Sequence, residues 1–140
     1  MNPIFTLIEP TAPSVPILLS IPHLGTDSPK ELKDHYDPAL AQRPDDTDFD
    51  LDKLYDFAPS LGITTIYANY SRWLIDLNRS PDNQSLYQDG RIITALCPIT
   101  DFKRNPIYKE KGLEPNPEEI ERRKGAYYDP YYQKIEEILG

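Results

Sequence analysis

Fifteen prolines are spread along these 140 residues, and they limit how long any helix or strand can be. Proline lacks a backbone N–H and has a fixed φ, so it interrupts helix interiors and central strands. Because the prolines are dispersed, they indicate boundaries between short elements and not a disordered tract. Ten tyrosines also favour an ordered chain, since their rings supply buried area. The length is sufficient for one domain with its own core.

Apolar segments between these boundaries predict buried strands. Pro16–Ile21 ends at the turn residues Pro22–Gly25, and Ile63–Ala68 is rich in β-branched residues. Further short strands are predicted over Trp73–Leu77 and Arg91–Leu96. The carboxyl end of the first strand is then the edge at which open α/β sheets bind ligands.

Two regions predict helices. A helix starting near Phe49, capped by Thr47 or Asp48, would have one apolar stripe. The stripe consists of Leu51, Leu54, Tyr55 and Ala58. In the C-terminal region, Asn116–Pro117 is a helix start, and Asp129–Pro130 predicts a second cap and restart. Alternating strands and helices predict an α/β fold with a mainly parallel sheet, which we expect to be incomplete because no strand follows the last helix.

The charge balance excludes one class of partner. The net charge is −8 and the pI is about 4.7, whereas nucleic-acid binding requires a basic surface. No apolar segment reaches the length of a membrane span, and no signal peptide is recognisable at the N-terminus. The single cysteine, Cys97, fits a reducing compartment. We therefore predict a cytoplasmic protein that binds neither nucleic acid nor membranes.

The segment Ser71–Pro81 carries the charged side chains that are most informative about function. It contains Arg72, Asp76, Asn78 and Arg79 around an apolar run. A guanidinium beside an amide is suited to binding a carboxylate, because both present N–H donors. The alternative is that these are ordinary surface charges after a strand, with Asp76 as a structural partner of either arginine.

A second group of side chains could bind a metal. His23 follows the first predicted strand, and Asp46 and Asp48 precede the first predicted helix. Imidazole and carboxylate ligands together suit zinc. The alternative is a histidine bonded to backbone in a turn, with acids that interact favourably with a helix dipole.

Taken together, these segments resemble the N-formylglutamate amidohydrolase (N-formylglutamate deformylase) family. The resemblance covers nearly the whole chain, and the ordered set of segments is what makes it specific. The matching segments are Ser20–His23 with Gly25, Asp46–Asp48 with Leu54–Tyr55, Ser71–Arg72, Ile75–Arg79, Leu96–Pro98, Leu113 with Pro115, Arg122, and Tyr127–Tyr128 with Pro130–Tyr131. The Asp76–Arg79 segment also resembles the aspartoacylase branch of the zinc carboxypeptidase-like hydrolases.

The resemblance implies a three-layer α/β/α, zinc carboxypeptidase-like fold and a zinc-dependent hydrolysis of N-formyl-L-glutamate to glutamate and formate, a reaction of histidine degradation. It implies that His23 is a metal ligand together with Asp48, which we prefer to Asp46. Arg72 would stabilise the oxyanion, and Asn78 with Arg79 would bind the substrate carboxylate.

Several features depart from the family pattern. Leu24 stands where the family usually has serine, and Tyr132 where it often has histidine. Family members are longer, and their second half carries a further metal-ligand histidine and a general-base carboxylate. We therefore expect residues 1–140 to be one domain truncated at its C-terminal end. The alternatives are a non-catalytic carboxylate-binding remnant, one chain of a split hydrolase completed by a partner chain, and an unrelated interaction protein with tyrosine-rich helices. An unfinished sheet would also expose an apolar edge, from which we expect self-association.

Overall fold

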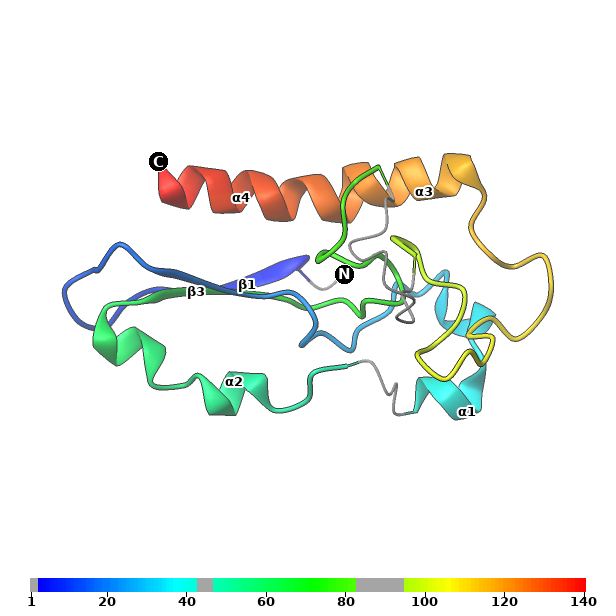
Figure 1. The fold of residues 1–140 in the computed structure, drawn as a ribbon, viewed down its shortest axis with the longest axis horizontal. Helices are drawn as coiled ribbons and strands as arrows, with labels where there is room; N and C mark the ends of the chain where they lie inside the picture. Colours follow the sequence, from blue (N-terminus) through cyan, green and yellow to red (C-terminus); the bar gives the residue numbers. More distant parts are fainter. Residues whose placement is uncertain (1–2, 43–46, 83–94) are drawn as a thin grey trace, which may run out of the picture.

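The computed structural model of the chain describes residues 3–42, 47–82 and 95–140. Its sheet has three strands, β1 (Phe5–Ile8), β2 (Leu18–Ile21) and β3 (Thr64–Ala68), in the order β1-β3-β2 (Figure 1). The two strands predicted near residues 16–21 and 63–68 are therefore confirmed. β2 runs parallel to β3, but β1 is antiparallel to it, so the sheet is mixed and not mainly parallel.

The observed strands differ from the predicted ones in two places. β1 was not predicted, although it pairs with β3 from Phe5 opposite Ala68 to Ile8 opposite Thr65. The strand predicted over Trp73–Leu77 is wrong, because this segment forms turns. Its apolar side chains are buried, but a short apolar run indicates burial and does not by itself indicate a strand. The strand predicted over Arg91–Leu96 falls mostly outside the described residues.

The C-terminal region is one continuous helix. It consists of α3 (Pro117–Arg123), a π-helical turn η3 (Lys124–Tyr128) and α4 (Asp129–Leu139). The predicted start is confirmed, since the Asn116 side chain accepts a hydrogen bond from the Glu119 N–H at 2.8 Å. The predicted restart at Asp129–Pro130 is wrong, because Asp129 has helical dihedrals. A wider π turn before Pro130 accommodates the missing N–H without ending the helix.

The helix predicted from Phe49 is divided into two short pieces. α2 (Leu51–Leu54) and the 3₁₀ turn η2 (Ala58–Leu61) replace it, and neither Thr47 nor Asp48 is its cap. Pro59 cannot donate to the carbonyl of Tyr55, which instead accepts from the Ala58 N–H at 3.1 Å in a tighter turn. Two further short elements precede this region, η1 (Lys33–His35) and α1 (Pro38–Ala41).

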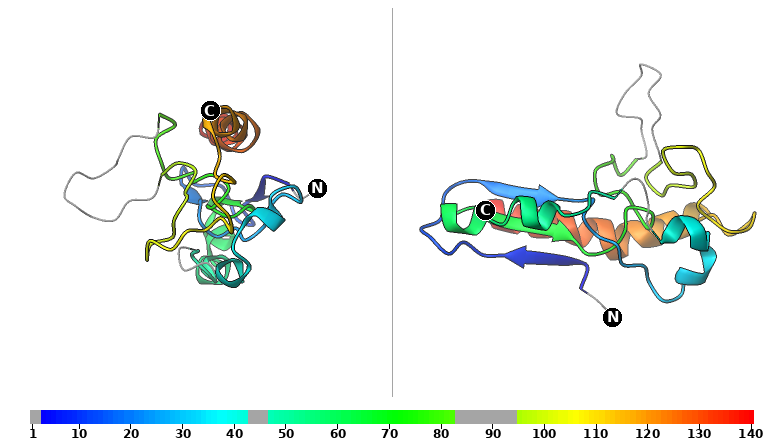
Figure 2. Two further views of the ribbon diagram at one scale, coloured as in Figure 1. Left: turned by 90° about the vertical axis from the view of Figure 1, so that its right-hand side faces the viewer. Right: turned by 90° about the horizontal axis from the view of Figure 1, so that it is seen from below.

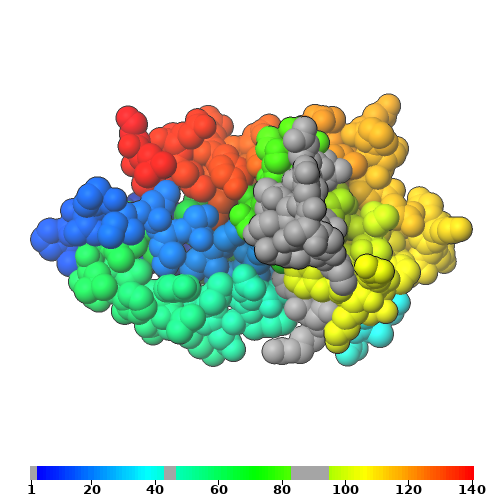
Figure 3. Space-filling view, in the orientation of Figure 1, coloured from blue at the N-terminus to red at the C-terminus, as the bar shows by residue number. Residues whose placement is uncertain are grey.

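Helical segments lie on both sides of the sheet. Figure 1 shows the C-terminal helix along one face of the strands and α2 along the other. The perpendicular views confirm that this helix is a separate layer running beside the sheet (Figure 2). In the space-filling view it forms one long border of the molecule (Figure 3). The architecture is therefore mixed α/β, as expected.

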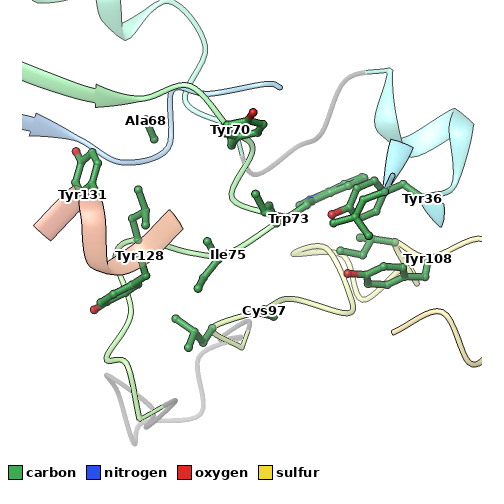
Figure 4. Close-up of a cluster of buried hydrophobic side chains, with 14 of the residues drawn as sticks. Tyr36, Ala68, Tyr70, Trp73, Ile75, Cys97, Tyr108, Tyr128 and Tyr131 are labelled. Carbon is green, nitrogen blue, oxygen red and sulfur yellow. The ribbon is translucent and has the colours of Figure 1, made fainter. Parts of the chain in front are cut away.

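The buried core extends past the sheet into the segments that follow β3. Trp73 packs against Tyr36 with ring centroids 5.5 Å apart, and Tyr36 packs against Tyr108 at 5.1 Å (Figure 4). Tyr131 of α4 is fully buried on the sheet side. Within the described residues, no helix is both long and apolar enough to cross a membrane.

Candidate functional site

The parallel strands β2 and β3 remain paired beyond their ends, and this brings their carboxyl-terminal loops together. The Asp27 N–H donates to the Asn69 carbonyl at 3.0 Å, and the Ser71 N–H donates to the Asp27 carbonyl at 2.8 Å. Gly25 permits the close approach, because a Cβ there would lie 2.4 Å from the backbone oxygen of Tyr70. This glycine explains why the predicted turn places His23 beside the residues after β3.

Asp76 is the centre of the resulting cluster. Its side chain is fully buried and accepts hydrogen bonds from His23 Nε2 at 2.6 Å and from the Asn78 backbone N–H at 2.9 Å. Its second oxygen accepts from Arg72 Nη2 at 2.6 Å. An ionised carboxylate only accepts, so His23 donates to it from Nε2. The prediction that Asp76 pairs with an arginine is confirmed; its bond to His23 was not predicted.

These donors keep Asp76 ionised. Burial alone would raise its pKa, but the hydrogen bond from His23, the charge of Arg72 and the Asn78 N–H lower the pKa to about 2. A carboxylate in this state holds both His23 and Arg72 in fixed directions. The cluster therefore couples the turn after β2 to the segment Ser71–Pro81 through one side chain.

Arg72 is held on a second side by Phe102. The guanidinium carbon lies 4.8 Å from the centre of the Phe102 ring, within the range of a cation–π contact. The buried Asp101 side chain accepts from the backbone N–H groups of Lys103 and Asn105 at 2.9 and 2.8 Å, which fixes this turn. Arg72 Nη1 also lies 3.4 Å from His23 Nδ1. Arg72 is therefore buried, oriented and close to His23.

The C-terminal helix holds the backbone of the segment Leu74–Arg79. This segment is not a strand, so its buried carbonyls require other partners. Arg123 Nη1 donates to the Leu74 carbonyl at 3.0 Å, and the Tyr128 hydroxyl donates to the Arg79 carbonyl at 2.7 Å. The Tyr132 hydroxyl donates to the Leu77 carbonyl. Sequence reasoning missed all three contacts, because nothing in the local pattern links residues about 50 positions apart.

The predicted metal ligands are only partly brought together. The Asp48 N–H donates to the His23 carbonyl at 3.0 Å, and the Asp48 carboxylate lies 3.8 Å from His23 Nδ1. Asp46 falls outside the described residues. Within the described ranges, no group of three or more His, Cys, Asp and Glu side chains is arranged to hold a metal.

The predicted carboxylate-binding pair lies at the border of the cluster. Asn78 is exposed. The Arg79 side chain is 11% exposed, with Nη1 3.6 Å from Asp76 and donating to the Asn78 carbonyl at 3.1 Å. Cys97 is buried, and burial, partly opposed by the charge of Arg123, raises the pKa of its thiol to about 11. A buried thiol with a raised pKa is a poor nucleophile.

Comparison with known proteins decides the family. Residues 15–140 match the family model described as N-formylglutamate amidohydrolase. The chain belongs to the N-formylglutamate amidohydrolase family. N-formylglutamate deformylase from Pseudomonas aeruginosa is 40% identical over 129 residues, and that from Pseudomonas putida is 39% identical over 125 residues. These alignments cover 90% and 89% of the chain but 46% and 45% of the relatives, so the chain spans about half their length.

Solved structures agree with this membership of the N-formylglutamate amidohydrolase family. The N-formylglutamate amidohydrolase from Ralstonia eutropha JMP134 is similar with a TM-score of 0.73 and 25% identity, over 97% of this chain and 51% of that one. A gene product from Agrobacterium tumefaciens has the same fold, with a TM-score of 0.72 and 18% identity over 99% and 50% of the two chains.

Proposed function

We propose that this chain carries the substrate-orienting part of an amidohydrolase site for N-formyl-L-glutamate, which is hydrolysed to glutamate and formate. The observation that carries the proposal is the buried Asp76 carboxylate, which binds His23 and Arg72 at the carboxyl edge of the parallel strand pair. The names of the two Pseudomonas relatives support the substrate.

Arg72 and the Asn78–Arg79 pair have separate roles in this proposal. Asp76 and Phe102 orient the Arg72 guanidinium, whose Nη1 lies 3.4 Å from His23 Nδ1, and this guanidinium would stabilise the developing oxyanion of the formamide. Asn78 and Arg79 then bind a substrate carboxylate and fix the scissile bond beside Arg72. A preorganised guanidinium stabilises the transition state because it needs no rearrangement during the reaction.

The donors present fit one side of a zinc site. His23 Nδ1 is the ring nitrogen that Asp76 leaves available, and the 3.8 Å to the Asp48 carboxylate suits two donors at about 2 Å from one ion. A bound zinc ion would supply Lewis acidity and a water of lowered pKa, about 7. Catalytic zinc uses three protein ligands as a rule, so the proposal requires a further donor besides His23 and Asp48. Asp46 stays a candidate.

The finer fold assignment also belongs to this proposal. A three-layer, zinc carboxypeptidase-like domain would need more strands than the three described here. Relatives about twice as long supply the length for such a sheet. The cytoplasmic location, the part in histidine degradation and a completing partner or self-association likewise stay predictions.

A second candidate function is carboxylate binding without catalysis. It is favoured by the finding that the described residues contain only two of the donors that zinc catalysis needs. Both functions predict binding of a glutamate-like ligand, and they differ in hydrolysis.

Titration of the purified chain with N-formyl-L-glutamate, with and without zinc, tests both functions. Arg79→Ala should weaken binding about 10- to 100-fold, because a charged hydrogen bond is lost. Lys53→Ala is the matched control, since its side chain is 79% exposed and its ion pair with Asp50 is at the surface. Equal effects of the two substitutions would contradict the assignment of Asn78 and Arg79 as the carboxylate-binding pair. Formate release with stoichiometric zinc that is lost in His23→Ala supports hydrolysis, whereas ligand binding without formate release supports the second function.

A further inference from the structure

Two tyrosines of the C-terminal helix hold the backbone on either side of Asn78. Tyr128, at the end of η3, donates to the Arg79 carbonyl at 2.7 Å, and Tyr132 of α4 donates to the Leu77 carbonyl. These two carbonyls flank Asn78 in the turn Leu77–Arg79. The two hydroxyls therefore hold the backbone immediately before and immediately after Asn78.

The two tyrosines form a rigid unit. Tyr128 and Tyr132 are four residues apart, hence on one helix face, and their ring centroids are 4.8 Å apart. Tyr128 is 8% exposed and Tyr132 is half-buried. Burial, followed by the neighbouring ring, raises the pKa of Tyr128 to about 12, and burial also raises the pKa of Tyr132. Both hydroxyls are therefore protonated donors at neutral pH.

The π turn explains how one helix reaches both ends of this segment. Hydrogen bonding over five residues in η3 brings residues about five apart onto one side of the helix. Arg123 and Tyr128 are five apart, and they donate to the carbonyls of Leu74 and Arg79. An uninterrupted α-helix would turn these two side chains away from each other. The irregular turn thus aligns the helix with the segment that carries Asp76, Asn78 and Arg79.

We propose that Tyr128 and Tyr132 are positioning residues that set the direction of the Asn78–Arg79 pair through its backbone. The inference rests on the proposed function, since the pair is taken there to bind the substrate carboxylate. Each hydroxyl donates to a backbone carbonyl of this segment. Their effect on the substrate therefore passes through the peptide segment Leu77–Arg79.

The test uses single-atom deletions with a control on the same helix. Tyr128→Phe and Tyr132→Phe each remove one hydroxyl, and the double variant removes both. Tyr131→Phe removes a fully buried hydroxyl that instead contacts Ser20 at 2.7 Å and the Ile66 carbonyl at 3.5 Å. The first measurement is amide hydrogen exchange at Asn78, whose N–H donates to Asp76. The second is the affinity for N-formyl-L-glutamate.

We expect exchange at Asn78 to accelerate about fivefold in each single variant, and more in the double variant, because each lost hydrogen bond frees the segment. The affinity should fall by a similar factor. Tyr131→Phe should leave the exchange rate at Asn78 and the affinity for N-formyl-L-glutamate unchanged, even if it lowers the melting temperature as much as Tyr128→Phe or Tyr132→Phe does. Exchange at Asn78 that responds equally to Tyr131→Phe and to the double variant would overturn the inference. Because exchange needs no ligand, it decides the matter even if the chain binds no N-formylglutamate and the proposed function fails.

Discussion

Replacing Gly25 by alanine should separate β2 from the continuation of β3 and destabilise the whole site. The added Cβ would lie 2.4 Å from the Tyr70 oxygen, 2.5 Å from the Asn69 carbonyl carbon and 2.7 Å from the Ala68 oxygen. All three atoms belong to the backbone, so no side-chain rotation relieves the clash. The segments after β2 and β3 must therefore move apart, which breaks the backbone hydrogen bonds of Asp27 with Asn69 and Ser71.

The size of this effect follows from its parts. Overpacking in a well-packed region costs about 1–3 kcal/mol, and two backbone hydrogen bonds contribute about 2 kcal/mol together. Alanine also lowers the entropy of the unfolded chain, which offsets at most about 1 kcal/mol. The free energy of unfolding should therefore fall by about 2–4 kcal/mol, a large part of the about 5–15 kcal/mol of a typical domain.

Urea unfolding followed by circular dichroism measures this change, with Gly125→Ala as the matched control. Gly125 lies within η3, and apart from its chain neighbours and the nearby backbone of its own helix, no heavy atom of the described residues comes within 4 Å of the position of its added Cβ. That variant should be as stable as the natural chain or up to about 1 kcal/mol more stable. If Gly25→Ala lost less than about 1 kcal/mol, the close approach of the two strands would not be what positions His23.

Two further predictions concern charged groups. Asp76→Asn leaves the Arg72 guanidinium buried without its carboxylate, so we expect a loss of about 3–5 kcal/mol in the free energy of unfolding. The control in the same urea titration is Asp52→Asn, at an exposed position. If Asp76→Asn lost no more than this control, the central role of Asp76 would be refuted. The hydrogen bond from Arg122, opposed by partial burial and helped by Arg123, lowers the pKa of Glu119 to about 2 from 4.5, so its stabilisation is present above about pH 4.5 and is lost as the pH falls toward 2. Because the ion pair of Glu119 with Arg122 is partly exposed, Glu119→Gln should cost only about 1 kcal/mol at pH 7. The difference in urea midpoint between the natural chain and Glu119→Gln should narrow between pH 5 and pH 3. A difference that is constant across this range would contradict the lowered pKa of Glu119.

The sequence predicted those elements whose signals are local. Asn116 and Pro117 contain a complete helix start, and the β-branched run before Ala68 is typical of a central strand. His23 was recognised as a candidate because it follows a predicted strand, and Arg72 because its guanidinium lies in the charged segment Ser71–Pro81. In these cases the residues that decide the structure are neighbours in the chain.

The failures involve partners that are distant in sequence. Trp73–Leu77 has the apolar composition of a strand, but its carbonyls at Leu74 and Leu77 bond side chains of the C-terminal helix. β1 is a strand because it pairs with β3, and no local pattern distinguishes its four residues from other apolar runs. The bond from His23 to Asp76 spans 53 positions, so sequence patterns could indicate each residue but not their contact.

The use of a late helix to fix an early loop has a consequence for biosynthesis. Tyr132 follows Leu77 by 55 residues, so at about 5–20 residues per second it leaves the ribosome about 3–11 s later. Throughout that interval the Leu77 carbonyl is without its hydroxyl partner, and the Arg79 carbonyl waits nearly as long for Tyr128. The strands can pair as soon as β3 has emerged, yet Asn78 and Arg79 acquire their final direction only after synthesis has reached α4. Folding of the site is thus governed by the order of translation as well as by the stability of the finished domain.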